Sequence, residues 1–203
     1  MEISHILYKV DNLKVGAELF EDRGFKVEYG SPKNPHNALV YFNDGSYIEI
    51  IQNMGFTKPL AFILRKIGYK DFVDGMLKQE NSPEGYIRIA FENEDDSFFR
   101  EKSILDQLGQ KSVIVPIKRK DIKGDVLQCK CLFPFNASYP FVKSKFLNFS
   151  ERDIKHPNGA VGIGAVEYHT SWEIIDYIER LGGCTNLKLQ VGDEKIDVNF
   201  IYA

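Results

Sequence analysis

The chain has 203 residues, a formal net charge of −3 and a 43% share of hydrophobic residues. That much apolar material offsets the entropy of ordering a chain, so the composition excludes a mainly disordered protein. The net acidity gives no general attraction to phosphate backbones, and no run approaches the ~18 apolar residues that span a membrane. We therefore expect neither a nucleic-acid nor a membrane partner.

The first 52 residues predict the order strand, helix, strand, strand, strand. Residues 3–10 have the composition of a strand, and Asn12 is placed to cap a helix that Gly24 ends. Two apolar runs then flank Asp44-Gly45, a dipeptide typical of tight hairpin turns. This stretch is interpreted as a first βαβββ module, residues 1–52.

The same order of elements recurs twice along the chain. Residues 53–84 are predicted to form a helical insertion that packs over a sheet or a pocket mouth. A second βαβββ module is expected at 85–149, followed at 150–203 by a connector and a partial third βαββ unit. All of these are expected to form one compact domain. Repetition on this scale indicates stacked or paired supersecondary units.

Strand–helix alternation also occurs in parallel doubly wound sheets. Here each helix is followed by two or three strands joined by tight turns, which favours antiparallel pairing. The predicted fold class is therefore α+β, with repeated βαβββ modules that form a curved, mostly antiparallel sheet around a cavity.

His5 and Glu49 are the strongest pair of candidate functional residues. Side chains two apart in a strand share a face, so His5 lies with Ile3 and Leu7, and Glu49 with Tyr47 and Ile51. Each polar side chain thus interrupts an apolar face. An imidazole and a carboxylate together suit a divalent transition metal. The alternatives are a half-buried His–Glu hydrogen bond, or a glutamate that faces water.

Three other positions are candidates for binding a ligand. His36 and Asn37 precede the strand at 38–42, and Asn37 either points into the cavity or orders its own loop through an Asx turn. Arg88 lies between Ile87 and Ile89, so it either receives a carboxylate or phosphate or sits on the outer face.

The three cysteines, Cys129, Cys131 and Cys184, are expected to be free thiols. Cys129 and Cys131 are two apart in a strand-like run, so they share a face and cannot easily bridge each other. Reduced cysteines and the lack of a signal-peptide pattern at the amino terminus favour a cytoplasmic protein.

The order of elements and several local sequences resemble the glyoxalase-like members of the vicinal oxygen chelate superfamily. The resemblance depends on His5 in the first strand, the helix end DRGF, the loop YGSPKNPHNAL and the strand FNDGSYIEI. Further along, LFPFNASYPFVKSKF and KHPNGAVGI are similar to the end of the second module and the connector in such proteins.

This resemblance implies paired modules around a small-molecule cavity. In metal-dependent relatives each module supplies ligands from its first and last strands. By position, His5 and Glu49 match the first module's pair, with Glu49 as ligand or catalytic base. The second module departs from the pattern, because its first strand has no histidine and its last offers Lys143 and Ser144.

The resemblance and this departure favour a small-molecule-binding protein without a complete metal site. Asn37, Tyr47 and Arg88 would then order the ligand, and no cofactor is expected. The alternative is a metal-dependent lyase, isomerase or dioxygenase-type enzyme that uses His5 and Glu49, so a divalent metal is left open. The sequence likewise leaves a homodimer open.

Overall fold

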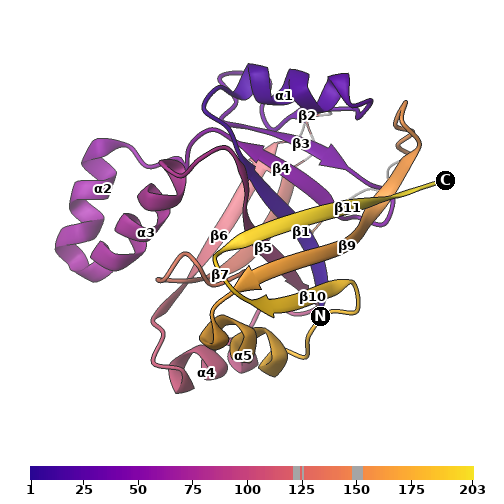
Figure 1. Ribbon diagram of the computed structural model, residues 1–203. Coiled ribbons are helices and arrows are strands. Elements are labelled where there is room, and N and C mark those ends of the chain that lie inside the picture. The colour runs from indigo at the N-terminus through magenta and orange to yellow at the C-terminus, as the bar shows by residue number, and fades with distance from the viewer. Residues whose placement is uncertain (121–123, 125, 148–152) are drawn as a thin grey trace.

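The protein is described by a computed structural model covering residues 1–203 except 121–123, 125 and 148–152, with only the backbone described at 119 and 120. Figure 1 shows the course of the chain. The boundary expected between residues 149 and 150 lies outside the described residues.

The first part of the chain forms four strands and one helix. In chain order these are β1 (Glu2–Lys9), α1 (Leu13–Asp22), β2 (Glu28–Tyr29), β3 (Asn37–Tyr41) and β4 (Tyr47–Ile51). Asn12 caps α1, because its side chain accepts hydrogen bonds from the amides of Lys14 and Val15. Gly45 has a φ of 88° in the turn between β3 and β4, a conformation that favours glycine.

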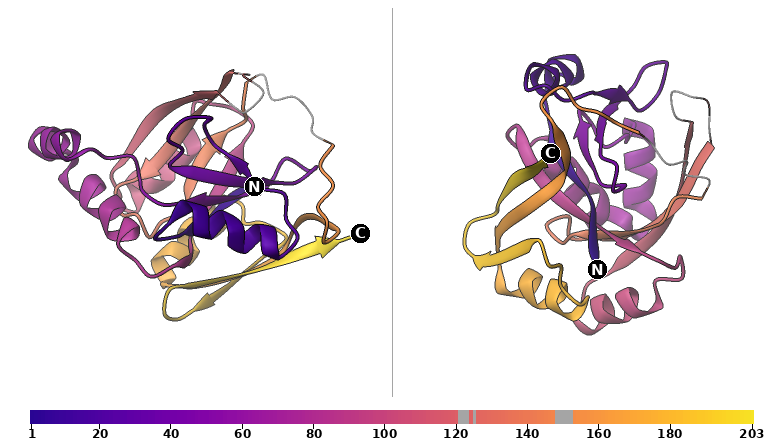
Figure 2. Two further views of the ribbon diagram at one scale, coloured as in Figure 1. Left: turned by 90° about the horizontal axis from the view of Figure 1, so that it is seen from above. Right: turned by 90° about the vertical axis from the view of Figure 1, so that its right-hand side faces the viewer.

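The insertion is helical, as its sequence predicts. It consists of α2 (Lys58–Leu64), the π-helical segment η1 (Arg65–Tyr69) and α3 (Lys70–Glu80). A kink at Ile67 and Gly68, where Gly68 has a φ of 96°, separates the two α-helices. They project from one side of the molecule in Figures 1 and 2. The buried face of α3, with Phe72, Val73 and Met76, packs against Phe133 and Phe135.

The rest of the chain supplies the remaining strands and two helices. They are β5 (Gly85–Asn93), α4 (Phe99–Gln107), β6 (Ser112–Lys120), β7 (Val126–Pro134), β8 (Phe141–Ser144), β9 (Ala160–Thr170), α5 (Trp172–Arg180), β10 (Leu187–Val191) and β11 (Lys195–Tyr202).

Eight strands form one curved sheet in the order β2-β3-β4-β1-β5-β8-β7-β6. Its pairings are antiparallel except β1 with β4 and β5 with β8. The α+β class and the curved, mostly antiparallel sheet are thus confirmed. The third unit differs from the first two, because β9, β10 and β11 form a separate sheet in the order β10-β9-β11. A long β9 pairs with both of its neighbours, so the strand pairing of this unit stays within its own three strands.

The main core lies on the convex side of the large sheet. There the sheet packs against α1, α4, α5 and the three-stranded sheet, as the views in Figure 2 show. Fully buried members from different elements include Ile6, Phe20, Ile50, Leu105, Val166 and Tyr177. Because the convex side carries this core, the concave side can hold a pocket.

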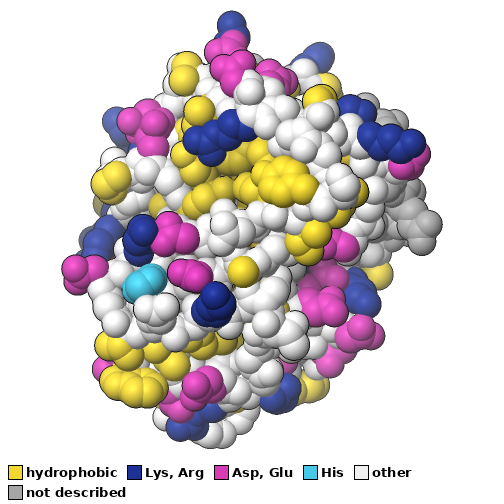
Figure 3. Space-filling view, turned by 45° about the vertical axis from the view of Figure 1, so that its right-hand side comes forward, with side chains coloured by type: hydrophobic (Ala, Val, Ile, Leu, Met, Phe, Trp, Pro, Cys, Tyr) yellow, Lys and Arg dark blue, Asp and Glu magenta, His cyan; other side chains and the backbone are white. Residues whose placement is uncertain are grey.

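On the outer surface shown in Figure 3, lysine and arginine side chains are interspersed with aspartates and glutamates, with apolar side chains gathered in the upper part. No helix of the described residues is long and apolar enough to cross a membrane.

Candidate functional site

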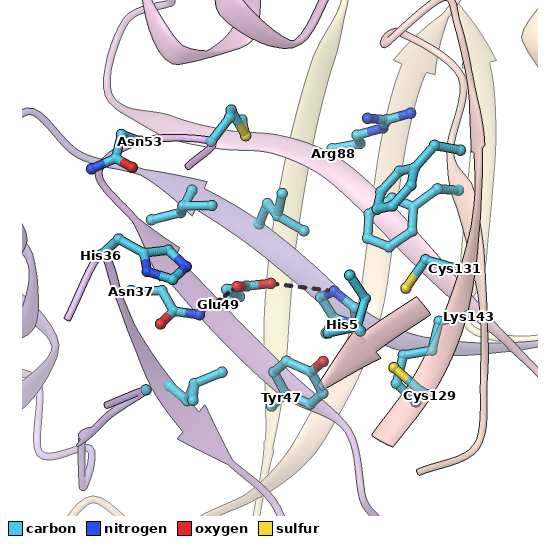
Figure 4. Close-up of a pocket in the computed structure, with 18 of the residues that line it drawn as sticks. His5, His36, Asn37, Tyr47, Glu49, Asn53, Arg88, Cys129, Cys131 and Lys143 are labelled. Atoms are coloured by element: carbon cyan, nitrogen blue, oxygen red, sulfur yellow. Dashed lines mark hydrogen bonds and ion pairs between the residues drawn. The ribbon is translucent and has the colours of Figure 1, made fainter. Parts of the chain in front are cut away.

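The concave face of the large sheet contains a pocket of about 430 Å³. Its wall comes from β1, β3, β4, β5, β6, β7 and β8, and from residues of α3 and of the segments before β3, after β4 and after β8. Figure 4 shows 18 of the residues that line it. The pocket lies in the size range of small-molecule sites.

His5 lies in the wall of this pocket and is 3% exposed. Its ring stacks on Tyr47, with centroids 4.3 Å apart and planes 7° from parallel, and meets the ring of Phe141 edge-on. Its Nδ1 is 3.2 Å from Ser4 Oγ. These contacts fix the ring plane, so Nε2 keeps one direction.

Glu49 is the acceptor that faces His5. Its Oε2 is 3.4 Å from His5 Nε2, and its Oε1 accepts a 2.7 Å hydrogen bond from Asn37 Nδ2. Parallel pairing of β1 with β4 brings these side chains together, because His5 is opposite Tyr47 and Leu7 is opposite Glu49. The Glu49 side chain remains 18% exposed, so a ligand in the pocket can reach it.

The side chain of Asn37 packs very closely against the backbone of Gly30. A Cβ on Gly30 would lie 2.0 Å from Asn37 Oδ1, far inside van der Waals contact. Only glycine therefore leaves room for the amide that orients Glu49. The Asx-turn interpretation of Asn37 is wrong, because the amide bonds Glu49 from within β3 instead of ordering its own loop.

His36 and Tyr47 both line the pocket at different depths. His36 is exposed, and its carbonyl accepts the amide hydrogen of Gln52. Tyr47 is buried against His5. In Figure 4, His36, Asn37, Glu49 and His5 follow one another across the pocket.

Arg88 is a pocket residue, and the outer-face interpretation is wrong. It is 2% exposed, and its Nε donates to the carbonyl of Tyr139 at 3.0 Å. The alternation along β5 is interrupted by a bulge opposite Leu7 and Tyr8, but Arg88 still shares the concave face with Ala90. Arg88, a charged residue between two isoleucines in the sequence, thus lies inside the fold.

The second half of the sheet presents different side chains at the equivalent positions. His5 is opposite Ala90 where β1 meets β5. Glu49 is paired with Leu7, two residues after His5, and Lys143 is paired with Glu92, two residues after Ala90. Ala90 and Lys143 therefore occupy the positions that correspond to His5 and Glu49.

Lys143 is buried and paired within its own half. Its ammonium forms an ion pair with Glu92, donates to the carbonyl of Ser144 at 3.1 Å, and lies over the ring of Phe146. A buried cation is thus fixed where a symmetric metal site would need a carboxylate.

Cys129 and Cys131 line the same wall, and none of the three cysteines, Cys184 included, forms a disulfide. A hydrogen bond with Cys129 and burial raise the pKa of Cys131 well above its usual range. Cys131 is therefore a neutral thiol, a weak ligand compared with a thiolate.

The described residues do not fit a metal site of three or more protein ligands. His5 and Glu49 are suitable donors, but Ala90 has no donor atom and Lys143 is a cation. Within the described residues, no group of three or more histidine, cysteine, aspartate or glutamate side chains is placed to hold a metal ion. A tight catalytic site uses three or four ligands.

Sequence reasoning missed the aromatic and thioether part of the pocket. Phe133 and Phe141 form an adjoining pair of rings, and Met76 reaches in from α3. Strand periodicity shared with Cys129 and Cys131 would have placed Phe133 on the pocket face. Met76 carries no such signal, because the position of α3 over the sheet is a tertiary feature.

Paired βαβββ units, a curved sheet and a concave pocket with a His–Glu pair define a protein of the vicinal oxygen chelate class. Residues 3–173 match the model of the glyoxalase-like domain family. The chain therefore belongs to this family.

Solved structures share the fold at low sequence identity. A hypothetical protein from Staphylococcus aureus has a TM-score of 0.65 at 15% identity, covering 95% of this chain and 87% of that one. A Mn(II)-bound glyoxalase from Novosphingobium aromaticivorans has a TM-score of 0.57 at 12% identity, covering 98% and 64%. A catechol 2,3-dioxygenase has a TM-score of 0.51 at 10% identity, covering 97% and 74%. Comparison with curated proteins gives no match.

Proposed function

We propose that this protein binds a small organic molecule in the concave pocket, without a tightly held metal. The observation that carries this proposal is the hydrogen-bonded Asn37–Glu49–His5 cluster in the wall of an otherwise largely apolar cavity of about 430 Å³. Apolar walls with a few fixed polar groups are typical of ligand sites.

Glu49 is the polar centre of the proposed site. Asn37 occupies Oε1 and His5 approaches Oε2, so the carboxylate is oriented before a ligand arrives. A hydroxyl or amide N–H of the ligand would donate to Glu49, while the rings of Tyr47 and Phe141 would contact its apolar body. His36, at the exposed edge, would contact the part of the ligand nearest to solvent.

Histidine ring signals in a proton–carbon NMR spectrum provide a direct test, because the chain has four histidines. Neutral aromatic amides and alcohols should shift the His5 and His36 signals with a shared dissociation constant. The signals of His156 and His169, which do not line the pocket, should stay in place. A set of compounds that leaves the His5 signal unchanged would count against the site.

The second candidate is a metal-assisted enzyme in which Glu49 serves as ligand or base. His5 and Glu49 favour it, since an imidazole and a carboxylate meet at 3.4 Å inside the pocket. The Mn(II)-bound glyoxalase of the same fold also supports it. Elemental analysis of untagged protein prepared without chelator separates the two candidates. One tightly held metal per chain, lost in His5→Ala, would overturn our proposal and favour the metal-assisted enzyme.

A further inference from the structure

Arg88 is a buried cation that forms no ion pair with any described residue. Its Nε donates a hydrogen bond to the Tyr139 carbonyl, and its Nη1 lies 3.2 Å from Met76 Sδ, a weak acceptor. Its buried Nη2 has no hydrogen-bond partner among the described residues. A buried charge in this state is costly unless something compensates it.

The surroundings of Arg88 compensate only part of that cost. Its Cζ lies 5.2 Å from the ring centre of Phe141 and 5.7 Å from that of Phe133, within the range of cation–π attraction. Burial lowers the pKa of Arg88 to about 10, so the guanidinium is still charged at neutral pH. Glu194 is near enough to favour the charged form but makes no ion pair with it.

We propose that Arg88 binds the carboxylate of an aromatic or otherwise flat apolar ligand in the concave pocket. This inference rests on the proposed function, because it assigns the charge and shape of the molecule that the same pocket holds. Nη1 and Nη2 form one edge of the guanidinium, and a carboxylate can accept from both in a bidentate pair. The Phe133 and Phe141 rings would contact the ligand's flat body.

A carboxylate fits these surroundings better than a phosphate does. One negative charge balances the one positive charge of Arg88, and the neighbouring Phe133, Phe141 and Met76 offer no further strong donors. Lys143, the other buried cation of the pocket, is already paired with Glu92. A dianionic phosphate would therefore carry an unbalanced charge into an apolar space.

Met76 covers the edge of Arg88 that the carboxylate would use. Its unbranched thioether side chain adapts readily and is a poor acceptor, so a ligand oxygen can replace it. Figure 4 shows Arg88 apart from the His5–Glu49 pair, and the contact with Met76 places its guanidinium at the end of the pocket closed by α3. A ligand bound at Arg88 would thus extend toward Glu49.

The test compares phenylacetate, its neutral analogue phenylacetamide and phenyl phosphate, with affinities measured by calorimetry or NMR titration. The wild-type protein should bind phenylacetate at least about tenfold more tightly than the amide, and more tightly than phenyl phosphate. In Arg88→Met this preference for the acid over the amide should disappear. The matched control is Lys118→Met, which removes an exposed cation at the edge of the pocket and should keep the preference.

Thermal unfolding without ligand separates a binding role from a structural one. Removing a buried charge that is only partly compensated should leave the melting temperature of Arg88→Met unchanged or raise it. A marked fall, with the preference for phenylacetate retained, would mean that Arg88 serves only to hold the Tyr139 carbonyl. If the variant does not fold, the affinities of the wild type for phenylacetate and phenylacetamide still test the inference, because equal affinities would overturn it.

The outcomes also distinguish this inference from the proposed function. Equal binding of acid and amide with shifts at the His5 ring would leave the pocket established and overturn the Arg88 anchor. Tighter binding of phenyl phosphate would overturn the choice of carboxylate. Failure of both phenylacetate and its amide to shift the His5 signal would count against the pocket itself, and the anchor would fall with it.

Discussion

The two halves of the large sheet share a backbone plan and differ in the side chains at equivalent positions. In the first half, His5 and Glu49 face each other across two neighbouring strands. In the second, Ala90 and Lys143 occupy the corresponding positions, and Lys143 is paired with Glu92. The pseudo-symmetry of the fold therefore does not extend to its chemistry. One half supplies an oriented carboxylate, and the other a neutralised cation and an aromatic wall.

The largest effect is expected in the second half, from Lys143→Met. This change leaves Glu92, a partly buried carboxylate, without its ammonium partner, and should lower the free energy of unfolding by about 3 kcal/mol in urea denaturation. Lys145→Met is the matched control, because Lys145 pairs with Glu94 at the surface and its loss should leave the unfolding midpoint unchanged. Equal losses of unfolding free energy in the two variants would show that the buried ion pair stabilises the fold no more than the surface pair.

A smaller effect is expected in the first half, from Gly30→Ala. The new methyl group would meet the amide of Asn37, so the variant should be destabilised by about 2 kcal/mol through overpacking. The hydrogen bond from Asn37 to Glu49 should also be disturbed. Gly192→Ala is the control, since its Cβ would make only ordinary contact with His169, 3.5 Å away. A tolerated Gly30→Ala with an unchanged Asn37 side-chain NMR signal would contradict the close contact.

The ring of His156, in the connector, forms hydrogen bonds with the first half of the molecule. Its contribution to the stability of the fold should depend on pH. Its Nδ1 accepts from the Lys26 amide at 2.9 Å and its Nε2 donates to the Tyr41 carbonyl at 3.0 Å, so the folded ring is neutral. Burial lowers the pKa of His156 below its usual 6.5. The unfolded chain then binds more protons below that pH, and stability is lost as the pH falls through 6.5 toward the folded value.

Urea denaturation on either side of this pH window measures the effect. The wild type should lose stability toward the acid side, and His156→Gln should lose less over the same interval. His169→Gln, at a histidine of the separate three-stranded sheet, is the control and should keep the wild-type dependence. A wild-type profile that is flat across the window would remove His156 as the cause.

The smallest effect is expected from thiol titration, which changes no residue. It tests the second half of the sheet, where Cys129 and Cys131 lie in β7. Unfolding without reductant should expose three titratable thiols. In the folded protein, half-buried Cys184 should react before the two buried cysteines of β7. Finding a single thiol after unfolding would indicate a disulfide and contradict the prediction of three thiols.

The sequence by itself determined the elements and which faces they present. Capping by Asn12, the Asp44-Gly45 turn and strand alternation depend on neighbouring residues, so they could be recognised locally. The same alternation placed His5 and Glu49 on faces shared with apolar side chains. The resemblance to glyoxalase-like proteins added the arrangement of paired modules.

Only the tertiary structure decided which of these faces meet. Glu49 lies beside His5 because β4 pairs in parallel with β1, and Arg88 is enclosed because α3 places Met76 over it. The close approach of Gly30 to Asn37 and the equivalence of Lys143 with Glu49 likewise depend on strand register. Local periodicity fixes the direction of a side chain, but pairing between distant strands and packing of the insertion fix its partners.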